Sequence, residues 1–152
     1  MSPRDEPASA LSILLVEDDP DDLDLALHAL REHRVANRIE VARDGAQALE
    51  FLFGDDGSHL RELKVVLLDL KLPKIDGLEV LRRIRAEPRT RFLPVVVLTS
   101  SSEDRDLVES YQLGVNSYVR KPVDFEQFTA CVRDLGLYWL LLNEPPPNLG
   151  MA

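Results

Sequence analysis

The chain alternates short apolar runs with longer amphipathic segments, five times in succession. The apolar runs are short and rich in branched residues, which is typical of strands buried on both faces of a sheet. We expect these strands at residues 13–16, 39–42, 65–68 and 94–98. Residues 116–122 are expected to form the last strand and the residues that directly follow it. Alternation with short links predicts parallel strands joined by right-handed crossovers, with helices on both faces. The predicted fold is a doubly wound α/β domain with a five-stranded parallel sheet and five helices.

Between the strands, apolar residues recur at the spacing of amphipathic helices. Asp21 or Asp22 is expected to cap the first helix, and Ser101 with Asp104 has the spacing of a capping box for the fourth. We expect the other helices to begin near residues 44, 76 and 124, and a loop over residues 54–62. These elements predict a flexible tail over residues 1–10, one folded domain over residues 11–143, and a proline-rich tail over residues 144–152.

Composition narrows the function classes. The 152 residues are 45% hydrophobic and 30% charged, which fits one globular domain. No apolar stretch approaches the roughly 20 residues of a membrane helix, and the N-terminus lacks a secretory signal, so we expect a cytoplasmic protein with no membrane partner. A formal net charge of −9 argues against a nucleic-acid partner. The single cysteine, Cys131, excludes an internal disulfide and is expected to be a buried structural thiol.

Polar residues follow directly on four of the predicted strands. Glu17 and Asp18 come after the first strand, Asp69 after the third, Thr99 after the fourth and Lys121 after the fifth. The carboxyl ends of parallel strands lie at one edge of the sheet, where ligands bind in open α/β folds. We therefore expect these five side chains to meet in one shallow pocket.

The chemistry of this pocket favours a divalent cation and a phosphoryl group. Three neighbouring carboxylates repel one another unless a cation lies among them, and Mg²⁺ prefers oxygen ligands. No cysteine or histidine stands at these strand ends, which argues against zinc. With Lys121 and Thr99 as donors to phosphoryl oxygens, Asp69 is placed to attack phosphorus and form an aspartyl phosphate.

The motifs around these residues resemble the response-regulator receiver family, the CheY-like domains. They occupy residues 16–19, 68–77, 98–100 and 118–122, within a match over roughly residues 11–142. The resemblance implies the flavodoxin-like strand order 2-1-3-4-5 and makes Asp69 the phosphoacceptor. It implies that Asp18 binds Mg²⁺ directly, that Glu17 acts mainly through metal-bound water, and that the main-chain carbonyl of Lys71 completes the metal ligands.

The same resemblance assigns roles to the remaining pocket residues. Thr99 and Lys121 would bind the phosphoryl group, with a cis peptide bond before Pro122. Thr99 and Tyr118 would form the switch pair, in which the hydroxyl moves to the phosphoryl group and the ring turns inward. The active surface is expected on the fourth helix, fifth strand and fifth helix.

Within the family, the chain looks most like single-domain receivers paired with phytochrome-type histidine kinases. The acidic run at residues 17–22, the insert at 54–62 and the ending at 138–147 carry that likeness. It implies a stand-alone response regulator of a two-component phosphorelay, phosphorylated by a histidine kinase. The signal would leave by contact with a downstream target or a phosphotransfer protein, without useful turnover of a free substrate.

Three other functions fit these residues less well. A Mg²⁺-dependent phosphohydrolase with an aspartyl-phosphate intermediate places a second acid two residues after the nucleophile, where this chain has Lys71 and so lacks a proton donor. A flavin-binding module on the same fold conflicts with the acidic edge and the missing phosphate-cradling loop. A calcium loop at residues 18–22 lacks the required glycine. His28, His33 and His59 are expected at the surface without partners.

The last helix has an apolar surface on every side over residues 135–142. A surface helix needs only one apolar stripe, so part of this segment is expected to stay exposed on a monomer and to mark an association surface. We predict a homodimer through Leu137, Tyr138, Trp139 and Leu141. The alternative is that residues 144–152 fold back over the patch.

Overall fold

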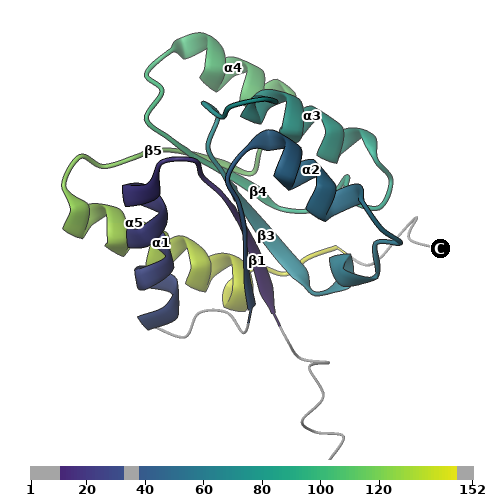
Figure 1. Ribbon diagram of the computed structural model, residues 1–152, viewed down its shortest axis with the longest axis horizontal. Helices are drawn as coiled ribbons and strands as arrows, with labels where there is room; N and C mark the ends of the chain where they lie inside the picture. Colours follow the sequence, from purple (N-terminus) through teal and green to yellow (C-terminus); the bar gives the residue numbers. More distant parts are fainter. Residues whose placement is uncertain (1–10, 33–37, 147–152) are drawn as a thin grey trace, which may run out of the picture.

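A computed structural model of the chain describes residues 11–32 and 38–146, in which five strands alternate with five α-helices (Figure 1). The strands are β1 (Ser12–Val16), β2 (Arg38–Ala42), β3 (Leu63–Leu68), β4 (Val95–Thr99) and β5 (Ser117–Arg120). The α-helices are α1 (Pro20–Glu32), α2 (Gly45–Phe53), α3 (Gly77–Ala86), α4 (Asp104–Gln112) and α5 (Phe125–Leu137). A 3₁₀ turn, η3 (Ser58–Arg61), precedes β3, and one π-helical turn, η4 (Tyr138–Leu142), continues α5.

The strands form one parallel sheet in the order β2-β1-β3-β4-β5, which confirms the predicted topology. From β1 the chain first builds outward to β2, then returns to the other side of β1 for β3, β4 and β5. The direction of winding therefore reverses between β1 and β3. Because crossovers are right-handed, this reversal places helices on both faces of the sheet and opens a crevice at the carboxyl ends of those two strands.

Alternating side chains of the central strands fill two hydrophobic layers. In β1, Ile13 and Leu15 face the layer beneath α1 and α5, whereas Leu14 and Val16 face the layer beneath α2 and α3. The helices lie on these two sides of the sheet in Figure 1. The period-two alternation explains why the strands read as continuous apolar runs, since both faces are buried.

Aspartates begin most of the helices. The carboxylate of Asp44 accepts a hydrogen bond from Gln47 N at 2.7 Å, and Asp76 and Asp124 cap α3 and α5 in the same way. The prediction for α1 is wrong by two or three residues. Asp19 is its cap, accepting from Asp21 N at 2.9 Å, because Pro20 takes the first helical position, where its missing N–H costs nothing.

The predicted capping box before α4 is also wrong. Glu103 is the cap residue of α4, and no side-chain hydrogen bond caps this helix. The hydroxyl of Ser101 instead donates to the carboxylate of Asp106 at 2.6 Å and accepts from Glu103 N at 3.2 Å. A tertiary role for the serine has replaced the local one that its spacing suggested.

The segment at residues 54–62 is a loop that contains η3. Its histidine, His59, is not a surface side chain without partners: its Nε2 atom lies 2.7 Å from the carbonyl oxygen of Phe51, and its ring packs against that residue. The predicted surface position is therefore wrong for His59. His28 is exposed as expected, but the prediction that it has no partner is wrong, because its Nε2 atom lies 3.3 Å from Glu32 Oε1, one helical turn along α1. His33 lies outside the described residues.

Helical structure continues to Leu142, as predicted, and stops at Asn143. Cys131 is half-buried, and burial raises the pKa of its thiol, which fits a structural role. Across residues 11–32 and 38–146, no helix combines the length and apolar character needed to cross a bilayer. The predicted tail at residues 1–10 lies outside the described residues, as does the predicted tail at residues 144–152 from residue 147 onward. Residues 143–146 carry no regular structure.

Candidate phosphoryl and metal site

The backbone continues the sheet by one residue beyond three of its strands. Glu17 N donates to the carbonyl of Ala42 at 3.0 Å, Asp69 N donates to Val16 at 3.1 Å, and Lys121 N donates to Thr99 at 2.8 Å. These bonds hold the first residue after β1, β3 and β5 at the same edge of the sheet. The predicted meeting of Glu17, Asp69 and Lys121 thus follows from the register of the strands.

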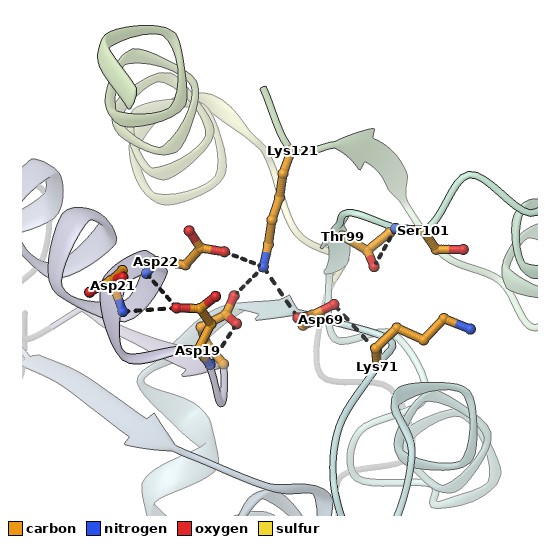
Figure 2. A network of polar contacts seen from close by, with 9 residues as sticks. Asp19, Asp21, Asp22, Asp69, Lys71, Thr99, Ser101 and Lys121 are labelled. Atoms are coloured by element: carbon orange, nitrogen blue, oxygen red, sulfur yellow. Dashed lines mark hydrogen bonds and ion pairs between the residues drawn. The ribbon is translucent and has the colours of Figure 1, made fainter. Parts of the chain in front are cut away.

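One ammonium group joins the acids at this edge. Lys121 Nζ lies 2.7 Å from Glu17 Oε1, 2.8 Å from Asp22 Oδ2 and 3.2 Å from Asp69 Oδ2. Figure 2 shows the lysine side chain reaching down from the exit of β5 between Asp22 and Asp69. The side chains of Lys121, Glu17 and Asp69 are all at most 8% exposed. Such buried charges persist only when each has a partner of opposite sign.

Three carboxylates converge closely enough to hold a cation. One ligand oxygen from each of Glu17, Asp18 and Asp69 lies within 4.8 Å of the others. Asp18 is exposed, whereas Glu17 and Asp69 are buried, so the cluster opens to solvent on one side. An all-oxygen donor set with an open side fits a hard divalent cation that keeps some of its water.

Burial and charge shift the pKa values of this cluster. Burial raises the pKa of Glu17 to about 7, and the charge of Asp69 adds to the rise while Lys121 opposes it. Burial acts to lower the pKa of Lys121, but hydrogen bonds to Asp22 and Glu17 and the charge of Asp69 outweigh it, so its pKa is raised overall. The lysine stays charged at neutral pH, whereas Glu17 is poised to take up a proton unless a second cation arrives.

The predicted switch residues, Thr99 and Tyr118, lie on the last two strands beside the acidic cluster and make no direct hydrogen bond to each other. Thr99 is fully buried, and its hydroxyl oxygen accepts a hydrogen bond from Ser101 N at 3.2 Å. The ring of Tyr118 packs against the layer beneath α2 and α3, and its buried hydroxyl has no hydrogen-bond partner among the described residues. Burial raises the pKa of this phenol.

Lys71 turns its main chain toward the pocket and its side chain away from it. Its N–H lies 3.3 Å from Asp69 Oδ1, and Figure 2 shows its side chain leading away from Asp69. The ammonium of Lys71 pairs with Glu103 and Asp106 at the start of α4. Gly77 packs directly beneath this loop, because its N–H donates to the carbonyl of Leu70 at 2.9 Å and a β-carbon here would overlap the carbonyl of Asp69. The predicted cis peptide bond before Pro122 is wrong. The Lys121–Pro122 bond is trans, the geometry that X-Pro bonds intrinsically favour.

The comparisons with known proteins agree with this geometry. A family model described as the response regulator receiver domain matches residues 13–133. The chain belongs to the response regulator receiver family. It is 44% identical to a probable methanogenesis regulatory protein, FilR2, of Methanothrix harundinacea, over 88% of this chain and 86% of that protein.

Solved receivers of phytochrome systems are also similar to it. The structure of the phosphorylated cyanobacterial phytochrome response regulator RcpA has a TM-score of 0.83 and 35% identity, covering 90% of this chain and 99% of that one. The bacteriophytochrome response regulator RtBRR is 54% identical with a TM-score of 0.67, covering 91% of this chain and 86% of that one. The chain is therefore a receiver similar to phytochrome response regulators.

Sequence reasoning missed one residue at the centre of this receiver site. Asp22 looked like a helix cap, yet its carboxylate lies closer to the ammonium of Lys121 than that of Asp69 does. A usable signal existed: side chains in the first turn of a helix lean back toward its N-terminus, which here is the site edge. Sequence reasoning also missed a second group, formed by Ser101, Asp106 and the ammonium of Lys71, because Lys71 reaches the start of α4 from the separate loop after β3.

Proposed function

We propose that this receiver is a phosphorylation-dependent switch whose Asp69 accepts a phosphoryl group from the phosphohistidine of a histidine kinase. The observation that carries the proposal is the buried ammonium of Lys121 held 3.2 Å from the carboxylate of Asp69. An Asp69 oxygen attacks phosphorus, the phosphorus–nitrogen bond breaks, and the imidazole leaves with that electron pair and takes a proton from solvent. Lys121 then exchanges carboxylate contacts for phosphoryl oxygens, and the Thr99 hydroxyl donates to one of them.

The acidic cluster supplies the second part of the proposal. Asp18, Asp69 and the main-chain carbonyl of Lys71 would hold Mg²⁺ directly, with Glu17 acting mainly through bound water. The bound ion would neutralise negative charge as the phosphoryl group approaches. The convergence of three carboxylate oxygens supports a divalent cation, and the absence of soft ligands among them supports Mg²⁺.

Intact-mass analysis after incubation with Mg²⁺ and a small acyl phosphate tests this function. Wild type should gain one acid-stable, base-labile phosphoryl group, and Asp69→Asn should gain none. Asp134→Asn is a matched control, because this aspartate is exposed on α5. An adduct that survives in Asp69→Asn, or none in wild type, would contradict the proposal.

The rival phosphohydrolase makes a different prediction. It needs a proton donor two residues after the nucleophile, and Lys71 there is turned away from Asp69 toward two acids that raise the pKa of its ammonium. We therefore expect no multiple turnover of a phosphate ester. Turnover that exceeds one phosphate per protein within minutes and vanishes in Asp69→Asn would favour the hydrolase.

We further propose that the donor is a phytochrome-type kinase and that the exchange takes place in the cytoplasm. The similarity to RtBRR and RcpA supports the kinase type, whereas the similarity to FilR2 shows that related receivers serve other pathways. Competition between a phytochrome-type kinase and an unrelated phosphorylated kinase, each at the same concentration, tests it. Equal transfer rates from both would remove the support for this partner.

The phosphorylated protein would signal through the face formed by α4, β5 and the start of α5. This face exposes apolar side chains that a protein partner could cover, namely Val108, Tyr111, Val123 and Phe125. A downstream target or a phosphotransfer protein would bind there. Val123→Asp should weaken capture of such a partner without altering phosphorylation of Asp69.

We also propose that the receiver forms a homodimer through the end of α5 and η4. Tyr138 and Leu141 are exposed there, together with Leu142, which supports an apolar contact. Leu137 and Trp139 pack partly against the layer beneath α1 and α5, so their share of the interface is smaller. Light scattering at micromolar concentration should give a dimer that Leu141→Glu dissociates. Val108→Glu on α4 is the control, and the opposite pattern would place the contact on α4.

A further inference from the structure

A polar network links the loop after β3 to the loop after β4, outside the pocket. The ammonium of Lys71 lies 3.0 Å from Glu103 Oε1 and 3.2 Å from Asp106 Oδ2. The buried carboxylate of Asp106 also accepts the 2.6 Å hydrogen bond from the hydroxyl of Ser101. These four residues close a bridge between two loops that no backbone hydrogen bond of the sheet joins.

Both ends of this bridge are hydrogen-bonded to residues of the phosphoryl site. On one side, the N–H of Lys71 points to the phosphoacceptor, Asp69. On the other, the N–H of Ser101 donates to the hydroxyl oxygen of Thr99. Any movement of the Thr99 hydroxyl toward a phosphoryl group on Asp69 must therefore break its bond to Ser101 or carry the loop of Ser101 with it.

The bridge also borders the unpartnered hydroxyl of Tyr118. This hydroxyl is buried and makes no well-formed hydrogen bond. Burial is the main cause of the raised pKa of the phenol; a side-chain contact with Ser101 acts against the rise, and the charge of Asp106 adds to it. A buried polar group without a partner is costly. The closed bridge directs the hydroxyl of Ser101 to Asp106, which itself pairs with Lys71, so the contact between Ser101 and the tyrosine stays short of a full hydrogen bond.

We propose that the Lys71–Asp106 ion pair is an autoinhibitory latch that holds the loop after β4 closed in the unphosphorylated receiver, and that switching opens it. The inference rests on the proposed function, since the opening serves a switch driven from Asp69. It adds a role for the side chain of Lys71 that is separate from its main-chain carbonyl. Opening frees Ser101 to follow Thr99 and frees space at the hydroxyl of Tyr118.

The latch is weak enough to be reversible. The side chains of Lys71 and Glu103 are 56% and 53% exposed, so that pair contributes little, whereas Asp106 is 6% exposed and its pair contributes more. Removing the ammonium should raise the open fraction of the loop by about three- to tenfold. A shift of that size biases a two-state element without unfolding it.

Amide hydrogen exchange of the unphosphorylated protein in EDTA tests the latch without any phosphorylation. Lys71→Met and Asp106→Asn should each speed exchange of the Ser101 and Glu103 amides by about three- to tenfold. The double variant should exceed the larger single effect only slightly, because both changes break one pair. Lys64→Met on β3 is the matched control and should leave this segment unchanged. Unchanged exchange at residues 101–106 in Lys71→Met, or an equal rise throughout the chain, would overturn the latch.

A second measurement links the latch to switching. In the presence of Mg²⁺ and beryllofluoride, which mimics a phosphoryl group on aspartate, wild type should acquire the fast exchange already present in free Lys71→Met. If wild type binds the mimic and residues 101–106 stay protected, the latch does not open on switching and the proposal fails. In another outcome, the mimic fails to bind Asp69 while the amides of residues 101–106 still exchange faster in Lys71→Met than in wild type. That result would keep the conclusion that the ion pair holds the loop closed and would contradict the proposed function.

Discussion

Replacing Lys121 by methionine isolates the energetic role of the buried ammonium. Methionine keeps an unbranched stem of similar length in the same packing and removes only the charge. The change leaves Glu17, Asp22 and Asp69 facing one another without the cation that lies within 3.2 Å of each of them. Two of these three carboxylates are almost completely buried, so water cannot take the place of the lost partner.

The expected cost follows from this burial. Removing one partner of a buried ion pair destabilises a protein by about 3–5 kcal/mol, because the other charge stays behind unpaired. Protonation of Glu17 limits the loss, since its pKa is already raised to about 7 and rises further without the lysine. Protonation of Glu17 becomes more costly as the pH rises, so at pH 8 we expect a loss of about 3–5 kcal/mol, which is a large part of the roughly 5–15 kcal/mol that holds a domain of this size together.

Urea denaturation in EDTA at pH 8 measures the effect directly. The double variant Lys121→Met/Glu17→Gln should recover at least about 1 kcal/mol relative to Lys121→Met, because it removes one of the unpaired acids. Excess Mg²⁺ should stabilise Lys121→Met more than wild type, since a second cation then takes over the role of the ammonium. Lys64→Met is the control for loss of a lysine elsewhere on the sheet.

The result that refutes this reasoning is a loss of less than about 1 kcal/mol for Lys121→Met at pH 8. Such a loss is typical of exposed ion pairs and would mean that the acids are solvated well enough to dispense with the lysine. Failure of the double variant to recover stability would instead show that packing, not charge, accounts for the loss.

Three further predictions follow from the same site. First, burial raises the pKa of Glu17 from 4.5 to about 7, so its protonated form stabilises the metal-free native state; this contribution is complete below pH 4.5 and is lost as the pH rises through about 7. Urea denaturation in EDTA should give a falling stability between pH 5 and 8, and Glu17→Gln should flatten that slope. Second, Gly77→Ala should lower the free energy of unfolding by about 1–3 kcal/mol, because the new β-carbon overlaps the carbonyl of Asp69; an unchanged Tm would contradict the close approach. Third, Asp22→Asn should bind beryllofluoride about two- to fivefold more tightly by titration calorimetry, because Asp22 competes for Lys121; weaker binding would mean that Asp22 positions the lysine instead.

The sequence by itself determined the layered fold and most of the pocket. Short continuous runs of branched apolar residues specify strands buried on both faces, and the helices between them require parallel strands. Once the strands are parallel, the residue after each strand must lie at one common edge. Glu17, Asp69, Thr99 and Lys121 could therefore be assigned to one site, and Asp44, Asp76 and Asp124 to helix starts.

Tertiary structure decided how those residues are paired. Asp22 and Lys121 are 99 positions apart, and Lys71 lies 32 residues before Glu103, so no local spacing reports either contact. The serine at position 101 matched a capping pattern, yet the packing of α4 against the loop after β3 gave its hydroxyl a different partner. Likewise, the apolar character of Trp139 indicated burial without saying whether its own core or a second molecule would cover it. Periodicity specifies which side chains need partners, but only the packed chain specifies which partner each one meets, because that depends on distances between segments that the sequence does not connect.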